Sequence, residues 1–156
     1  KAEKELQEQK FHRGLREVRP DKNVAEKYII KAEHNLQAAS YFKDGGFSDW
    51  SASAFFYCMY HCLLAILTKF GYESRNQECT FAVIDMLNEE GKISLDRRFV
   101  DTLRMTKAEE VGHSVIKTRE DYQYGFQLEL AETEEFERMS KWCKELIDKT
   151  KEIIQQ

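Results

Sequence analysis

Between Asp49 and Lys69 the chain carries a single side chain that titrates near neutrality, His61, although 33% of its 156 residues are charged. A segment this poor in charge cannot be solvated along its whole length, so it must face protein on most sides. Its apolar residues recur at steps of three and four, as on one stripe of a helix. The segment therefore predicts a buried central helix around which the rest of the chain packs.

Two faces of this predicted helix differ in side-chain size. The larger side chains alternate steps of four and three residues, which suits nearly antiparallel helix packing: Ala52, Phe56, Met59, Leu63, Ile66 and Phe70. A second face is formed by small side chains: Ala54, Cys58, Cys62 and Ala65. Small residues let another backbone approach closely, so we expect a neighbour on each side, and the small face suits either a second helix or a second subunit.

Apolar residues at helical spacing continue through most of the chain, and signals for strands are few. They predict further helices over residues 24–43, 81–87, 99–115 and 133–154. Polar residues in capping positions mark the predicted helix starts: Asp21 or Asn23, Ser48, Ser94 and Thr133. Gly45, Gly46 and Gly71 are expected to end the first two helices. The pattern predicts an all-α protein.

The length fits a single domain with a sizeable core, which we place at residues 21–156. Residues 1–20 form a charged extension with a weak apolar stripe, closed by Pro20, and we expect this extension to be helical. A net charge of -4 argues against non-specific binding to nucleic acids or anionic membranes, because both depend on summed positive potential. The central helix is too polar for a membrane span, since it includes Trp50, Tyr57 and His61.

The four cysteines, Cys58, Cys62, Cys79 and Cys143, lie in or beside apolar segments and are expected to be reduced, buried and cytoplasmic. A zinc site could be drawn from Cys58, His61 and Cys62. A closed zinc site needs four ligands, however, and only Cys79 is available as the fourth. Close packing of small core residues is the favoured interpretation, so we predict no metal and no cofactor.

The order of these features resembles that of a HEPN domain. The resemblance rests on an amphipathic helix with Glu33 and Leu36, a glycine turn, the aromatic run 54–61, the stop at Gly71, and an Arg-Glu-Asp-Tyr segment at 119–122. It covers about Val24 to Ile154 and implies an up-and-down bundle of about five to six helices that forms a homodimer. Such proteins are often encoded beside a minimal nucleotidyltransferase, and the small prokaryotic group with an Arg-x-Asp-Tyr segment is the most similar.

Some HEPN proteins cleave RNA, and the resemblance locates where that chemistry would lie. The ribonuclease members carry an arginine, a spacer of four to six residues and then a histidine, which together hold the phosphate and exchange protons. Arg119 aligns with the arginine, but Tyr124 stands where the histidine is expected. A tyrosine with a pKa near 10 is a poor base at neutral pH. His113 precedes Arg119, so it cannot be the histidine of that pair. Eight residues separate Arg104 from His113, which does not match the family spacing either.

We therefore predict a binding site instead of a catalytic one. The candidate ligand-binding residues combine charge and aromatic surface: Arg119, Asp121, Tyr122, Tyr124, Tyr57, Tyr60 and His61. The alternative is structural, with Arg119 and Asp121 in ion pairs, the tyrosine rings covering the core, and His61 hydrogen-bonded inside it.

Three functions follow from the resemblance. The first is a non-catalytic dimeric module that binds a nucleotidyltransferase partner, a nucleotide or RNA. The second is a toxin-antitoxin component with ribonuclease activity at an altered site. The third is a toxin whose tyrosine is nucleotidylated by a partner enzyme. The modified position of the family aligns with Phe126, so Tyr122 or Tyr124 would have to substitute for it.

Overall fold

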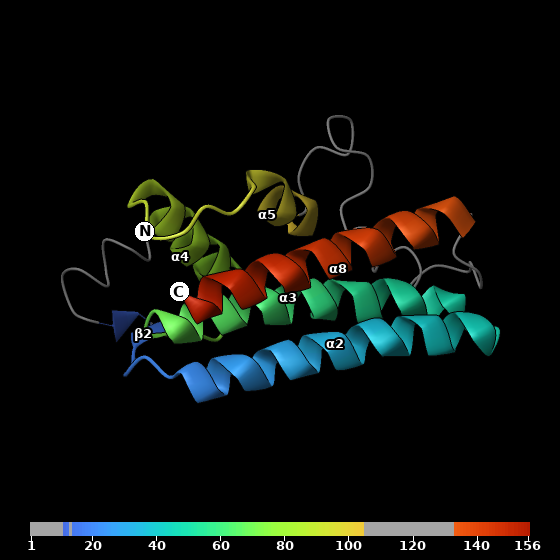
Figure 1. The fold of residues 1–156 in the computed structure, drawn as a ribbon, viewed down its shortest axis with the longest axis horizontal. Coiled ribbons are helices and arrows are strands. Elements are labelled where there is room, and N and C mark those ends of the chain that lie inside the picture. The colour runs from blue at the N-terminus through green and yellow to red at the C-terminus, as the bar shows by residue number, and fades with distance from the viewer. Residues whose placement is uncertain (1–10, 13, 105–132) are drawn as a thin grey trace.

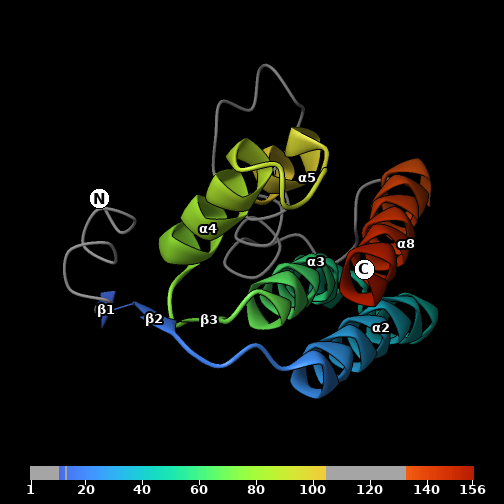
Figure 2. The same cartoon turned by 60° about the vertical axis from the view of Figure 1, so that its left-hand side comes forward.

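Three long helices form the centre of the protein. The computed structural model describes residues 11–12, 14–104 and 133–156. Helices α2 (Lys22–Asp44), α3 (Ser51–Lys69) and α8 (Thr133–Gln155) lie side by side, and each contacts the other two (Figure 1). The shorter α4 (Gln77–Glu89) and α5 (Arg97–Leu103) lie on another side of α3, as the turned view shows (Figure 2). The prediction of an all-α fold is confirmed.

Helix α3 is the centre of the core, as its lack of charge predicts. Its side chains include Phe55, Phe56, Leu63 and Ile66, all fully buried. Among the described residues, the segment Ser48–Lys69 is long and apolar enough to cross a membrane. However, 67% of its most apolar 18-residue stretch is buried inside the protein. Such burial is that of a core helix, because the apolar side chains already face protein.

The first two helices pack closely because small residues line their contact. Ala25, Ala32 and Ala39 of α2 are fully buried, and the hydroxyl of Ser51 on α3 donates to the carbonyl of Ala39 at 2.8 Å. Asp21 caps α2 by accepting from the amide of Val24, and Gly45 follows its last residue, as the sequence predicts.

The predicted cap of α3 is wrong. Ser48 does not cap it; instead it begins a 3-10 helix, η1 (Ser48–Trp50), that runs directly into α3. The turn before η1 is tight, since the amide of Phe47 donates to the carbonyl of Phe42 at 2.6 Å. This helical lead-in takes the place of a side-chain cap, and Ser48 is buried.

The small face of α3 is covered by the protein's own helices. Cys58, Cys62 and Ala65 are fully buried, and the thiol of Cys143 on α8 lies 3.7 Å from the carbonyl of Phe55. Of the two neighbours that the sequence allows for this face, a second helix or a second subunit, the structure shows a helix, α8. The close approach that small residues permit is used between α3 and α8 of one chain.

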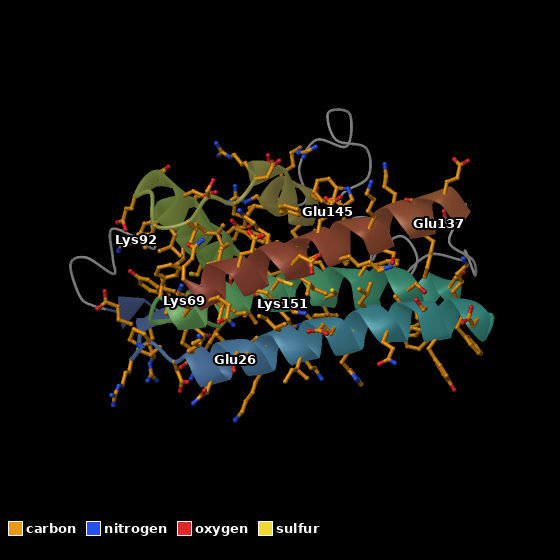
Figure 3. All side chains as sticks on the ribbon, in the orientation of Figure 1. Glu26, Lys69, Lys92, Glu137, Glu145 and Lys151 are labelled. Carbon is orange, nitrogen blue, oxygen red and sulfur yellow. The ribbon has the colours of Figure 1, made fainter. Side chains whose placement is uncertain are left out.

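Two lysine side chains connect the last turns of α8 to α3 and to α2. Lys69, at the end of α3, donates to the carbonyl of Ile153 near the end of α8, and Lys151 lies 3.3 Å from Glu33 of α2 (Figure 3). A cation at a helix C-terminus is favourable because the last carbonyls carry partial negative charge. The first contact joins the carboxyl ends of α3 and α8, and the second joins the last turns of α8 to the middle of α2.

The described part of the N-terminal extension is not helical, which corrects the prediction of a helix for residues 11–12 and 14–20. Strands β1 (Phe11–His12), β2 (Leu15–Glu17) and β3 (Tyr72–Ser74) form a small antiparallel sheet in the order β1-β2-β3. Leu15 is 1% exposed and belongs to the core. Pairing with β3 overrides the weak helical stripe, because strand formation depends on such partners more than on local preference.

Helix α4 begins before the predicted residue 81, and α5 begins at a different cap from the one predicted. Asn76 caps α4 by accepting from the amide of Cys79, and Asp96, not Ser94, caps α5 by accepting from the amide of Arg98. Within the described residues α5 ends at Leu103, and the rest of the helix predicted to Val115 lies outside them. Helix α8 already includes Thr133, the predicted cap, as its first residue.

Candidate ligand-binding site on helix α3

The structure describes three of the seven predicted ligand-binding residues. Tyr57, Tyr60 and His61 all lie on α3. The other four, Arg119, Asp121, Tyr122 and Tyr124, lie outside the described residues, as do His113 and Phe126. The part of the candidate site that lies on α3 is therefore the part described below.

Tyr57 and His61 face the surface beside α2. Tyr57 is 43% exposed, and its ring centroid lies 6.3 Å from that of the half-buried His61. Tyr28 of α2 lies 6.0 Å from His61 on a tilted ring plane, so the three rings form one group across both helices. We call this group, Tyr28, Tyr57 and His61, the α3 ring cluster. Tyr28 was not predicted as a site residue, because its spacing in the sequence marks only the inner stripe of α2.

The tautomer of His61 follows from its hydrogen bond. Nδ1 lies 2.6 Å from the carbonyl oxygen of Tyr57, one turn earlier on α3. A carbonyl oxygen only accepts, so Nδ1 must carry the proton and Nε2 holds the lone pair in the neutral ring. The contacts of His61 among the described residues are with tyrosines, and none is with an arginine. His61 can thus accept a hydrogen bond from a ligand, and none of these described contacts supplies the arginine that RNA cleavage needs.

Tyr60 has a structural role. Its ring stacks on Phe56 with centroids 5.8 Å apart, and its hydroxyl lies 3.0 Å from Oγ1 of Thr80 on α4. Burial raises the pKa of Tyr60 above its usual 10.0, against the effect of the Thr80 hydrogen bond. The phenol is therefore neutral at physiological pH. The structure brings Tyr57 and His61 together but assigns Tyr60 to the contact between α3 and α4.

The cysteines beside this site are part of the core. All four are free and buried. Burial raises the pKa of Cys62 and of Cys143 well above the usual 9.0, which keeps both thiols protonated. Across the described ranges, no three histidine, cysteine or acidic side chains are grouped as metal ligands. The Cys58 and Cys62 side chains face α8, whereas His61 faces Tyr28.

The helix arrangement is that of a small all-α bundle. Comparison with known families identifies which family of bundles it is. A family model described as the HEPN domain matches residues 25–154, which include α2 through nearly all of α8. The chain belongs to the HEPN domain family. This confirms the resemblance found in the sequence. A search of curated proteins gave no match.

Proposed function

We propose that this chain is a non-catalytic HEPN module that binds a nucleobase, in a nucleotide or in RNA, on the outer face of α3. The observation that supports the proposal is the α3 ring cluster, where aromatic surface lies beside a histidine acceptor. Aromatic side chains stack on bases without needing a particular sequence. The exposed ring of Tyr57 offers such a surface, and Nε2 of His61 can accept from a base amino group.

Net charge and the Tyr124 position support binding over catalysis. With a net charge of -4 the protein does not attract phosphates generally, so contact with a nucleic acid must be local and directed at bases. The histidine of the ribonuclease pattern is replaced by Tyr124. These two features favour a module that recognises a nucleobase and leaves the phosphodiester intact.

The proposal is tested by titrating the protein with adenine and guanine nucleotides and with short fluorescent single-stranded RNAs. Stacking on one base contributes about 1–3 kcal/mol, so Tyr57→Ala should weaken binding by about tenfold or more. Ile30→Ala is the matched control, since Ile30 is 66% exposed on α2 and lies outside the ring cluster. Equal affinity of wild type and Tyr57→Ala would remove the ring cluster as the site.

The same RNAs distinguish binding from cleavage. A binding module leaves the RNA intact on a denaturing gel with or without added metal. If the RNA is cut and Arg119→Ala abolishes the cutting, the ribonuclease function replaces the binding function. Arg119 is the residue to change because it aligns with the arginine of the ribonuclease pattern.

Homodimer formation and a nucleotidyltransferase partner are part of the proposed function. Light scattering at micromolar concentration should report twice the mass of the 18.5 kDa chain. A monomer at that concentration would contradict the dimer. Coexpression with a neighbouring nucleotidyltransferase should give a stable complex, and intact-mass analysis of the chain would show whether a tyrosine gains a nucleotide.

A further inference from the structure

A second aromatic surface lies at the turn between α2 and α3, away from Tyr28 and His61. It surrounds a pocket of about 740 Å³ lined by Tyr41, Phe42, Asp44, Gly45, Phe47 and Trp50. This volume falls within the roughly 300–1,000 Å³ typical of ligand pockets. We call it the turn pocket. Four of its six lining residues are aromatic, and one carries a negative charge.

The rings of the turn pocket are unusually exposed. Tyr41 is 79% exposed, Phe47 59% and Trp50 47%. Large aromatic side chains that gather at the surface mark an interaction site more often than isolated ones do. The core does not need these three side chains, because the inner side of the turn is closed by buried residues such as Ser48 and Ala39.

The charges at the turn pocket are negative. Asp44 lines the pocket as the last residue of α2, and Asp49 lies in the next short helix. The described lining residues include no lysine or arginine. Lys43, the neighbour of Asp44, instead places its ammonium 4.5 Å above the ring of Phe136 on α8. Among the described residues Asp44 forms no ion pair.

The position of Asp44 in its helix strengthens this point. The carboxyl end of a helix carries partial negative charge, so an acidic side chain there is unfavourable and a basic one is favourable. Asp44 adds a carboxylate at the end of the 23-residue α2. Together, the helix end and the carboxylate give the aromatic pocket a negative potential that a bound cation would relieve.

We propose that the turn pocket binds a basic peptide segment of a partner protein, through an arginine side chain whose guanidinium pairs with Asp44 and stacks on the rings. Arginine matches the pocket because its planar guanidinium forms two hydrogen bonds to a carboxylate and packs on aromatic faces. The high exposure of Tyr41 and Phe47 fits a peptide lying across the surface better than an enclosed small molecule. The negative charges disfavour a phosphate-bearing ligand here, so this site is separate from the proposed nucleobase site.

The experiment uses fluorescence anisotropy with a labelled peptide of alternating arginine and alanine. A peptide with citrulline in place of arginine keeps the planar shape and three of the five N–H donors, but it loses the charge. We expect the arginine peptide to bind at least tenfold more tightly than the citrulline peptide. Equal binding of the two peptides would overturn the assignment of a cation site.

Variants locate the binding on the protein. Asp44→Asn should weaken the arginine peptide about tenfold, whereas Asp148→Asn, which removes the same charge from an exposed position on α8, should leave its binding within twofold. Tyr41→Ala should also weaken binding, and its 79% exposure makes loss of folding an inadequate explanation. Equal effects of Asp44→Asn and Asp148→Asn would show attraction to overall charge and would overturn the proposal. Tyr57→Ala should not change peptide binding.

Discussion

The inner side of α3, which faces α8, and its outer side differ in how far their side chains are buried. The inner side meets α8 through small side chains, with Cys58, Cys62 and Cys143 fully buried. The outer side of α3, the turn before it and the last turn of α2 carry large rings that remain partly exposed: Tyr41, Phe47, Trp50 and Tyr57. Large rings lie on both sides, since Phe55 and Phe56 of α3 are fully buried. The difference is one of exposure: the buried side contributes to stability, and the exposed rings are where we propose that recognition takes place.

The largest expected effect is on the inner side. Phe55 is fully buried and its ring packs edge-on against Phe136 at 5.0 Å. Phe55→Ala should lower the free energy of unfolding by about 3–5 kcal/mol, because it leaves a cavity between α3 and α8. Urea denaturation followed by circular dichroism measures this loss. If Tyr57→Ala, two residues away on the outer side, costs as much, the comparison between the two sides fails.

The small size of the inner residues is tested by enlarging one of them. Cys58→Leu should lower the free energy of unfolding by about 1–3 kcal/mol, because the close contact with α8 has no room for the added atoms. Cys58→Ala is the control, since it keeps the residue small. If urea denaturation gives the leucine and alanine variants the same free energy of unfolding, α3 and α8 can move apart to accept the larger side chain, and the prediction fails.

Tyr60, at the boundary between the two sides, gives a pH-dependent prediction. Its pKa in the folded protein is raised above 10.0 by burial, so the neutral phenol contributes stability below about pH 10 and that contribution is lost at higher pH. Tyr60→Phe should cost about 0.5–1.5 kcal/mol at pH 7, through the lost hydrogen bond to Thr80.

The wild type and the Tyr60→Phe variant should then differ in how steeply stability falls above pH 10. The wild type should lose more, because only it must ionise a buried phenol on that site. Thermal unfolding at a series of pH values measures both slopes. Parallel curves would contradict the raised pKa of Tyr60.

The smallest effect is expected on the outer surface. Tyr41→Ala should change the free energy of unfolding by less than about 0.5 kcal/mol, since the ring is 79% exposed. The same urea denaturation provides the measurement. A loss above 1 kcal/mol would show that the turn pocket is part of the stable core after all.

The sequence predicts the fold correctly where one helix faces protein on most sides, and it fails where structure depends on contacts with distant segments. The missing charge between Asp49 and Lys69 is enough to identify α3, because an uncharged helix of that length must be covered. Strand β2 could not be predicted, since Leu15 becomes buried only by pairing with a segment more than 50 residues later. Ser48 and Ser94 fail as caps for a similar reason. Whether a serine caps a helix depends on where the preceding turn leaves the backbone.

The sequence predicted some residues of the α3 ring cluster but could not define the cluster. Aromatic and histidine side chains at 57–61 were visible as a group, but helical spacing alone did not separate Tyr57 and His61 from Tyr60. That separation depends on α4, which provides Thr80 as a partner for Tyr60. Tyr28 joins the cluster only because α2 runs beside α3. The turn pocket was missed altogether, since exposure of Tyr41 and Phe47 is a property of the folded turn.

The hydrogen bonds between the N-terminal segment and the end of α3 bear on where this domain begins. The amide of Val18 donates to the carbonyl of Gly71, that of Asp21 donates to Thr68, and a Cβ on Gly71 would lie 2.7 Å from the carbonyl oxygen of Val18. The family match begins at residue 25, yet Leu15 and the cap of α2 lie before it. The packed core therefore extends beyond the residues that the family model matches. Shortening the protein to residue 25 would remove strands β1 and β2, the cap of α2 and a core side chain together.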